Sequence, residues 1–325
     1  MKIVAPDYYP SFCCIADKCR HSCCVGWEID VDSDTLSYYK NIGGVFGKRL
    51  SESIDEENGE AHFILDENER CPFLNSTGLC DVITCLGENS LCQICADHPR
   101  FRDYYSDRVE IGLGLCCEAA AKLILGTKHK VKLVTFEDDG EREELCKNEK
   151  DFLSVRKKIF EKITRREKSL DERIDDIMKL FKASYCRKTP KEQAQLYMSL
   201  EKLDKNRDDV LIRLMNLKED AYTQAYLEKF ETAFEQLLSY LIYRHLPGAI
   251  DDGKLLQRLI FAADSTCFVK NLCAVKYNEN YALTLDDIAE AARFFSSEIE
   301  YSEENLNKCI DDCAKRSISF ETFFI

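Results

Sequence analysis

The chain has 325 residues, a hydrophobic content of 45% and a formal net charge of −14. This length is enough for two domains that need no disulfide bonds or metals to be stable. The acidic balance argues against a nucleic-acid partner, because phosphate binding needs a clustered basic surface. No run of about 18 apolar residues suggests a transmembrane segment, and the opening residues do not form a signal peptide. We therefore expect a cytoplasmic protein.

The first 126 residues predict an irregular, loop-rich domain. They hold ten of the thirteen glycines, four of the six prolines and all but six of the cysteines. Short strands are predicted at Ala61–Leu65 and Arg108–Ile111. The segment Cys117–Leu125 predicts a helix that ends at Gly126.

From residue 127 to residue 325 the pattern predicts an all-α domain. Residues 130–136 alternate and could form a strand, and the acidic residues 137–141 suggest a linker. Thr284 and Asp287 resemble a capping box. Helical spacing of apolar residues recurs in Phe152, Val155, Ile159 and Ile163, in Ile174, Ile177, Met178 and Phe181, in Leu196, Leu200 and Leu203, and in Tyr226, Phe230, Phe234, Leu237, Leu241 and His245. The sequence therefore predicts a mainly α protein, with an irregular, cysteine-rich metal-binding domain over 1–126 and an all-α helical domain over 127–325.

The cysteines are the most informative residues. Twelve of eighteen fall within the first 117 residues, and five lie between positions 13 and 24. A protein kept in a reducing compartment rarely uses so many cysteines for disulfides, and thiols at this density indicate a metal site. Iron–sulfur clusters commonly take four thiolates from a short loop and from more distant residues.

Structural zinc is the alternative metal, and it prefers pairs of cysteines two to four residues apart. Cys19–Cys23 and Cys92–Cys95 have that spacing, and His21, His62 or His98 could replace a thiolate. The remaining alternative is that the thiols are buried small hydrophobes. We expect this of the six C-terminal cysteines, including Cys309 and Cys313 on one predicted helix.

The N-terminal sequence resembles the flagellin lysine-N-methylase family over about residues 10–126. The matching segments are Cys14-Ile-Ala-Asp-Lys-Cys19, Cys23-Cys24-Val-Gly-Trp27-Glu-Ile-Asp30, Arg70-Cys71-Pro-Phe-Leu74, Gly78-Leu-Cys80, Leu86-Gly87-Glu88, Leu91 to Cys95, His98-Pro99-Arg100 and Leu115-Cys116-Cys117-Glu118. The resemblance implies transfer of methyl groups from S-adenosylmethionine to surface lysines of flagellin in the bacterial cytosol. It also implies a [4Fe–4S] cluster.

The resemblance assigns eight cysteines to metal binding: Cys14, Cys19, Cys23, Cys24, Cys71, Cys80, Cys95 and Cys116. Eight is twice what one cluster needs, so two metal centres, or one cluster with additional thiols, are both open. The chain departs from the family at Cys117, where the family has proline, and at His98, where it commonly has tyrosine.

Two known routes to methyl transfer leave only partial signatures. Gly112-x-Gly114 follows a predicted strand, as in a glycine-rich donor loop, but Leu115 stands where a third glycine is expected. The alternative is a tight turn that places Cys116 at the head of a helix. The radical signature Cys-x3-Cys-x2-Cys would need a cysteine at position 26, which is Gly26.

Several other residues are candidates for the donor or the substrate. Arg100 could bind the carboxylate of S-adenosylmethionine or pair with a nearby acid, and Glu118 could orient a ligand or cap its helix. Trp27 could shield a cluster, pack in the core or contact a cation. Three acidic residues could recognise lysine or form a solvated turn: Asp30, Asp32 and Asp34.

We therefore expect a protein-lysine N-methyltransferase that depends on S-adenosylmethionine and a [4Fe–4S] cluster. The alternative is a non-catalytic iron–sulfur or zinc-binding module for interaction or electron transfer. Flagellin is the expected partner, bound by the helical domain unless that domain binds a second protomer.

Overall fold

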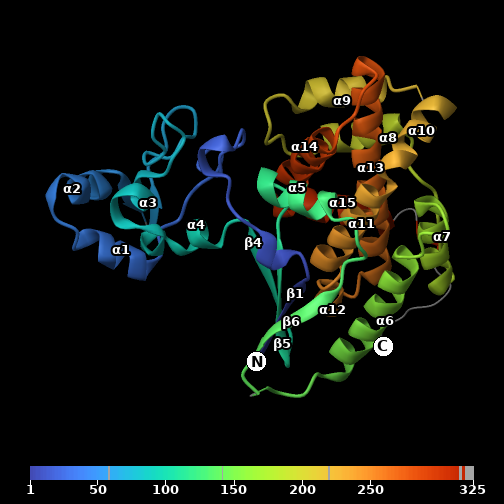
Figure 1. Ribbon diagram of the computed structural model, residues 1–325, viewed down its shortest axis with the longest axis horizontal. Coiled ribbons are helices and arrows are strands. Elements are labelled where there is room, and N and C mark those ends of the chain that lie inside the picture. Colours follow the sequence, from blue (N-terminus) through green and yellow to red (C-terminus); the bar gives the residue numbers. More distant parts are fainter. Residues whose placement is uncertain (58, 141, 219, 315–316, 319–325) are drawn as a thin grey trace. The chain divides into compact units, whose positions relative to one another are not determined.

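The computed structural model describes residues 1–325 except 58, 141, 219, 315–316 and 319–325, and it is mainly α, which confirms the predicted fold class (Figure 1). Its residues form two compact units. The cysteine unit contains the described residues of 13–101 together with 117–119. The helical unit contains residues 1–12, 102–116 and those described from 120 onward. The sequence-based division at residue 126 remains a prediction.

The cysteine unit consists of short elements around a small apolar core. Helix α1 begins where the Asp32 carboxylate accepts a hydrogen bond from the Thr35 amide at 3.0 Å. Strands β2 and β3 form a hairpin, and β3 overlaps the strand predicted at 61–65. Its elements are α1 (Ser33–Lys40), α2 (Gly44–Glu52), β2 (Ile54–Glu57), β3 (Glu60–Phe63), α3 (Asp81–Leu86) and α4 (Gln93–Asp97), with 3-10 turns at Ala16–Lys18 and Glu88–Ser90.

A four-stranded sheet lies almost wholly within the helical unit. Its order is β4 (Arg100–Tyr104), β5 (Arg108–Leu113), β1 (Lys2–Pro6) and β6 (Leu133–Asp138). Strand β1 runs parallel to β5 and antiparallel to β6. The strands predicted near 108–111 and 130–136 are therefore confirmed. Because β1 provides a pairing partner, β6 continues into the predicted linker, whose residue 141 lies outside the described residues.

The helices follow the predicted apolar stripes and caps. Capping boxes open α7 at Ser169 and Glu172, and α14 at Thr284 and Asp287 as predicted. The helix predicted at 117–125 is α5 (Glu118–Gly126). The others are α6 (Lys147–Ile163), α7 (Leu170–Leu180), α8 (Pro190–Met198), α9 (Arg207–Met215), α10 (Ala221–Leu227), α11 (Glu231–His245), α12 (Ala249–Asp252), α13 (Leu255–Asn280), α14 (Leu285–Phe295) and α15 (Glu303–Ala314), with a 3-10 turn at Tyr9–Ser11 and a short β7–β8 pair at Ser184–Tyr185 and Ser317–Ile318.

Helices α11 and α13 form the centre of the helical unit (Figure 1). Both have buried residues on every face, as expected of a helix enclosed by others. Helix α13 packs against α11, α14 and α15. A π-helical turn at Ser296–Glu300 follows α14. None of the described helices is long and apolar enough to cross a membrane.

Two predicted stripes extend beyond the helices that form. The stripe from Tyr226 to His245 is divided between α10 and α11 by a 3-10 turn at Glu228–Phe230. The stripe ending at Leu203 passes the end of α8 at Met198. There Arg207 donates to the carbonyl oxygen of Leu200 at 2.9 Å. This side-chain contact replaces the helical hydrogen bonds, so tertiary structure overrides the local pattern.

Candidate functional site

Five cysteines gather in the core of the cysteine unit. The structure describes all eighteen cysteines, and none of them forms a disulfide bond. The cysteines in this core, which we call the thiol cluster, are Cys24, Cys71, Cys80, Cys92 and Cys95. Four were predicted as metal ligands, whereas Cys92 was not. Its two-residue spacing from Cys95 was the signal that could have identified it.

The backbone explains why distant cysteines meet. The Cys71 amide donates to the Cys24 carbonyl oxygen at 2.8 Å, and the Gly26 amide donates to the Glu69 carbonyl oxygen at 3.0 Å. The loop that carries Cys24 therefore lies antiparallel to the segment that carries Cys71. A further bridge pairs Leu74 with Cys80, which returns the chain to the same core.

A hydrogen bond between two neighbouring thiols lowers the pKa of one cysteine and raises the pKa of the other. The bond with Cys23 lowers the pKa of Cys24 to about 7. The bond with Cys95 lowers the pKa of Cys92, and the pKa of Cys95 is raised in turn. Burial raises the pKa of Cys71 to about 12. Together the thiols are desolvated and close enough to influence one another, as expected of ligands that a metal would deprotonate.

Three other predicted ligands lie on the loop before Cys24. The hydrogen bond with Cys24 and burial raise the pKa of Cys23, and electrostatic repulsion from Cys14 and Cys117 raises it further. The Cys19 thiol donates to the backbone oxygen of His21 at 3.2 Å. His21 thus contacts this loop cysteine through its carbonyl group.

Glu118 fastens this loop. Its buried carboxylate accepts hydrogen bonds from the Arg20 amide at 3.0 Å and from the Arg20 side chain at 3.1 Å. The Cys19 sulfur lies 3.9 Å from the same carboxylate. Glu118 therefore orients the cysteine loop. Its role as a donor ligand stays a prediction.

Cys116, the eighth predicted ligand, belongs to the helical unit. Its sulfur lies 2.8 Å from the hydroxyl group of Tyr301. The Leu115 amide beside it donates to the Tyr240 hydroxyl at 3.2 Å. The turn after Gly112-x-Gly114 is thus fixed by tyrosines from the helices, two residues before α5 begins.

Trp27 and the predicted histidines have identifiable neighbours. The Trp27 indole donates to the Cys23 carbonyl oxygen at 2.7 Å, and its ring centroid lies 6.0 Å from that of His98. Burial lowers the pKa of His98 to about 4, with the Arg100 charge adding to the effect. A guanidinium nitrogen of Arg100 donates to the Ala96 carbonyl oxygen at 3.3 Å. The predicted contact of Arg100 with the methyl donor stays a prediction.

The thiol cluster offers five candidate ligands for the predicted metal site. Among the described residues, no three or more His, Cys, Asp or Glu side chains are arranged to hold a single metal ion. Tetrahedral zinc requires its ligands around one point. The thiolates of an iron–sulfur cluster bind separate irons, so they stand further apart. The [4Fe–4S] cluster and the alternative zinc ion therefore both stay predictions for these five thiols.

A groove of about 370 Å³ lies in the same unit. Its lining residues come from the Cys24 loop, the β2–β3 hairpin and the Cys71 segment: Trp27, Glu28, Asp55, His62, Phe63, Ile64, Leu65 and Glu69. His62 lies 3.7 Å from Glu28. Three carboxylates and one indole suit an alkylammonium ion, because acids pair with it and the indole face attracts cations. We call this hollow the acidic groove.

The acids predicted to recognise lysine have other positions. Asp32 caps α1 and also accepts a hydrogen bond from the Gln93 amide at 2.8 Å. Burial alone would raise its pKa, but the bonds from Gln93 and Thr35 lower it. Asp30 pairs through its backbone with His62, and Asp34 is exposed in the first turn of α1. None of the three lines the acidic groove.

Comparison with known proteins gives concordant results. The family described as the FliB lysine N-methylase C-terminal domain matches residues 112–324, more than half of the chain. The chain is 26% identical over 129 residues to a protein named Lysine-N-methylase in Salmonella typhimurium and to another in Salmonella choleraesuis. Each match covers 38% of this chain and 32% of the relative.

The same 26% identity over 129 residues relates the chain to the flagellar biosynthetic protein FliU of Salmonella muenchen, covering 38% of this chain and 76% of that protein. The chain thus spans about a third of the length of the two methylases that it matches. No solved structure matches it.

Proposed function

This chain belongs to the FliB lysine N-methylase family, and from this premise we propose that it transfers methyl groups from S-adenosylmethionine to lysine ε-amino groups of flagellin. We propose further that the thiol cluster holds a [4Fe–4S] cluster. The name of the FliU relative, a flagellar biosynthetic protein, supports flagellin as the substrate.

The observation that carries the proposal is the shared backbone of the thiol cluster and the acidic groove. The hydrogen bonds that join Cys24 to Cys71 and Gly26 to Glu69 belong to one antiparallel pairing. Trp27 and Glu69 on that pairing line the groove. A lysine held in the groove would therefore lie beside the segments that bear two of the thiols.

The residues of the groove have defined tasks in this reaction. The lysine ammonium would pair with the groove carboxylates and lie against the indole face of Trp27. These carboxylates belong to Glu28, Asp55 and Glu69. Methyl transfer needs the neutral amine, and a carboxylate in contact can accept its proton. A bound cluster would supply an iron that coordinates the methyl donor or a centre that transfers electrons.

Replacing one buried cysteine tests the metal proposal. After anaerobic reconstitution, Cys71→Ser should lose most of its iron and sulfide and most of its transfer of labelled methyl groups to flagellin. Cys85→Ser, at an exposed cysteine of the same unit, should keep both. Full iron content in Cys71→Ser would contradict the proposed ligand set. Zinc without sulfide in the wild type would support the zinc-binding alternative.

Substituting one groove acid tests the substrate site separately. Asp55→Asn should raise the KM for flagellin about tenfold, since it removes one charged partner of the lysine, and leave iron content unchanged. Asp34→Asn, at an exposed acid of α1, should leave KM as it is. A cluster-containing wild-type protein that methylates no flagellin lysine would overturn the proposed function and favour an electron-transfer module.

A further inference from the structure

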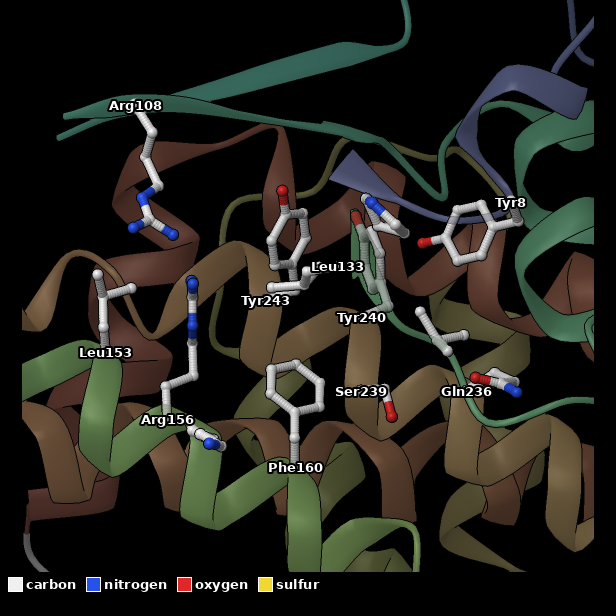
Figure 2. A pocket seen from close by; sticks show the side chains of 13 residues that line it. Tyr8, Arg108, Leu133, Leu153, Arg156, Phe160, Gln236, Ser239, Tyr240 and Tyr243 are labelled. Atoms are coloured by element: carbon white, nitrogen blue, oxygen red, sulfur yellow. The ribbon is translucent and has the colours of Figure 1, made fainter. Parts of the chain in front are cut away.

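The helical unit contains a cavity of about 360 Å³ that the proposed function does not use. Its size lies within the range of about 300–1,000 Å³ that is typical of small-molecule sites. Figure 2 shows side chains from β6, α6 and α11, together with Tyr8 and Arg108, around this space. All of these residues belong to the helical unit, so the cavity lies within one compact part of the fold.

Two helices each present one face to the cavity. The face of α6 supplies residues at the i, i+3, i+4, i+7 spacing, namely Leu153, Arg156, Lys157 and Phe160. The face of α11 supplies residues at the same spacing, namely Gln236, Ser239, Tyr240 and Tyr243. Val131 and Leu133 add apolar surface. The lining is therefore mostly apolar and aromatic with a few polar groups, as is usual for a small-molecule site.

The charged groups of the lining are all basic. Arg108, Arg156 and Lys157 contribute positive charges, and none of the described residues that line the cavity is a carboxylate. Figure 2 shows the guanidinium groups of Arg108, from β5, and Arg156, from α6, directed into the space between these two elements. The hydrogen bond with Asp107 raises the pKa of Arg108, whereas burial and the charge of Arg156 lower it. The two guanidinium groups are therefore close enough to repel each other, and an anion in the cavity would relieve that repulsion.

Arg156 is the most buried of the three cations, with 3% of its surface exposed. Its guanidinium nitrogens donate to the Tyr105 hydroxyl at 3.3 Å and to one carboxylate oxygen of Glu110 at 2.6 Å. The other oxygen of Glu110 is buried and has no hydrogen-bond partner among the described residues, so the pair is not bidentate. A guanidinium carries more N–H groups than these two bonds use. Arg156 therefore keeps donors for a bound anion, and carboxylates are its preferred acceptors.

The charge balance around the cavity matches a monoanion. Asp107 lies 2.7 Å from Arg108 and Glu110 lies 2.6 Å from Arg156, so these two carboxylates compensate the two arginines. Lys157 is exposed and has no ion-pair partner in the described part of the chain, which leaves its positive charge uncompensated. A carboxylate carries a single negative charge at neutral pH, whereas a phosphate monoester carries about two. The balance therefore favours a carboxylate.

We infer that this cavity binds an organic monocarboxylate with an apolar or aromatic body. The carboxylate accepts hydrogen bonds from Arg156, and the charge of Lys157 attracts it. The body packs against Leu153, Phe160 and the tyrosine rings of α11, which accept flat groups by stacking. This inference does not rest on the proposed methyl transfer, because the thiol cluster and the acidic groove belong to the cysteine unit.

Calorimetry of the full chain tests the ligand class with three probes: phenylpropionate, its uncharged amide and inorganic phosphate. Phenylpropionate should bind about tenfold or more tightly than the amide, because the amide cannot form charge-assisted hydrogen bonds. It should also bind more tightly than inorganic phosphate, which has no apolar body to bury. The inference would be overturned by equal affinities for phenylpropionate and its amide, by tighter binding of phosphate, or by no binding of phenylpropionate at about 10 mM.

Two neighbouring lysines of α6 test the location. Lys157→Gln should weaken binding of phenylpropionate about three- to tenfold, because it removes the uncompensated charge. The matched control is Lys158→Gln, at an exposed residue that is not part of the lining, and it should bind like the wild type. Ser239→Leu, which fills the cavity, should abolish binding. Both lysines are exposed, so their comparison decides the location even if Ser239→Leu does not fold, and equal affinities of the two lysine variants would refute it.

Discussion

Glu300 is the buried charge whose removal should cost the helical unit most. Its side chain has no exposed surface and accepts hydrogen bonds from Tyr240 at 3.0 Å, with Arg244 at 3.4 Å and His245 also in contact. Burial alone would raise the pKa of Glu300, but Arg244 and His245 lower it to about 2. Burial lowers the pKa of His245, so Arg244 is the counter-charge.

The substitution Glu300→Gln leaves the Arg244 charge buried without its partner. Removing one member of a buried pair costs about 3–5 kcal/mol. Because the folded-state pKa is depressed, this stability is present above the unfolded value near 4.5 and is lost as the pH falls toward 2.

Urea denaturation at pH 7 measures the effect. With a slope of about 3 kcal/mol per M, the midpoint for Glu300→Gln should fall by about 1 M or more. Glu304→Gln, which breaks an exposed pair with Lys308, should change stability by less than about 0.5 kcal/mol. The double variant with Arg244→Gln should be more stable than Glu300→Gln alone. Equal midpoints for Glu300→Gln and Glu304→Gln would refute the reasoning.

Three further substitutions follow from the same contacts. Burial and the Glu110 charge raise the pKa of Asp103 to about 7, so the folded protein loses stability as the pH rises from about 4 to 7. Asp103→Asn should therefore stabilise the protein by about 1 kcal/mol at pH 8 but not at pH 4. Equal effects at the two pH values would contradict this. Glu118→Gln should release the Arg20 loop and speed alkylation of Cys19 in the metal-free protein several-fold, as followed by mass spectrometry, and an unchanged rate would exclude the fastening role. Leu241→Ala, at a fully buried site, should lower the unfolding free energy by about 2–5 kcal/mol, and a loss below 1 kcal/mol would show that the α11 core can collapse around the gap.

Local patterns predicted much of the helical part. The stripes of α6 and α7 and the Thr284 capping box appear in the sequence because a helix repeats every 3.6 residues and its first turn needs a cap. The end of α8 could not be predicted in this way. Arg207 supplies hydrogen bonds there from a later helix, and no pattern within the α8 segment indicates that contact.

The sequence by itself determined that sulfur chemistry is concentrated in the first 117 residues, since spacing and composition are properties of the chain. Only the tertiary structure decided that Cys92 joins Cys24 and Cys71, while Cys116 meets Tyr301. It also placed Asp32 at the start of α1 and placed three other acids, Glu28, Asp55 and Glu69, with Trp27 in the lining of the acidic groove. The physical reason is that such sites form where backbone pairing joins residues distant in the chain, as the Cys24–Cys71 hydrogen bond does.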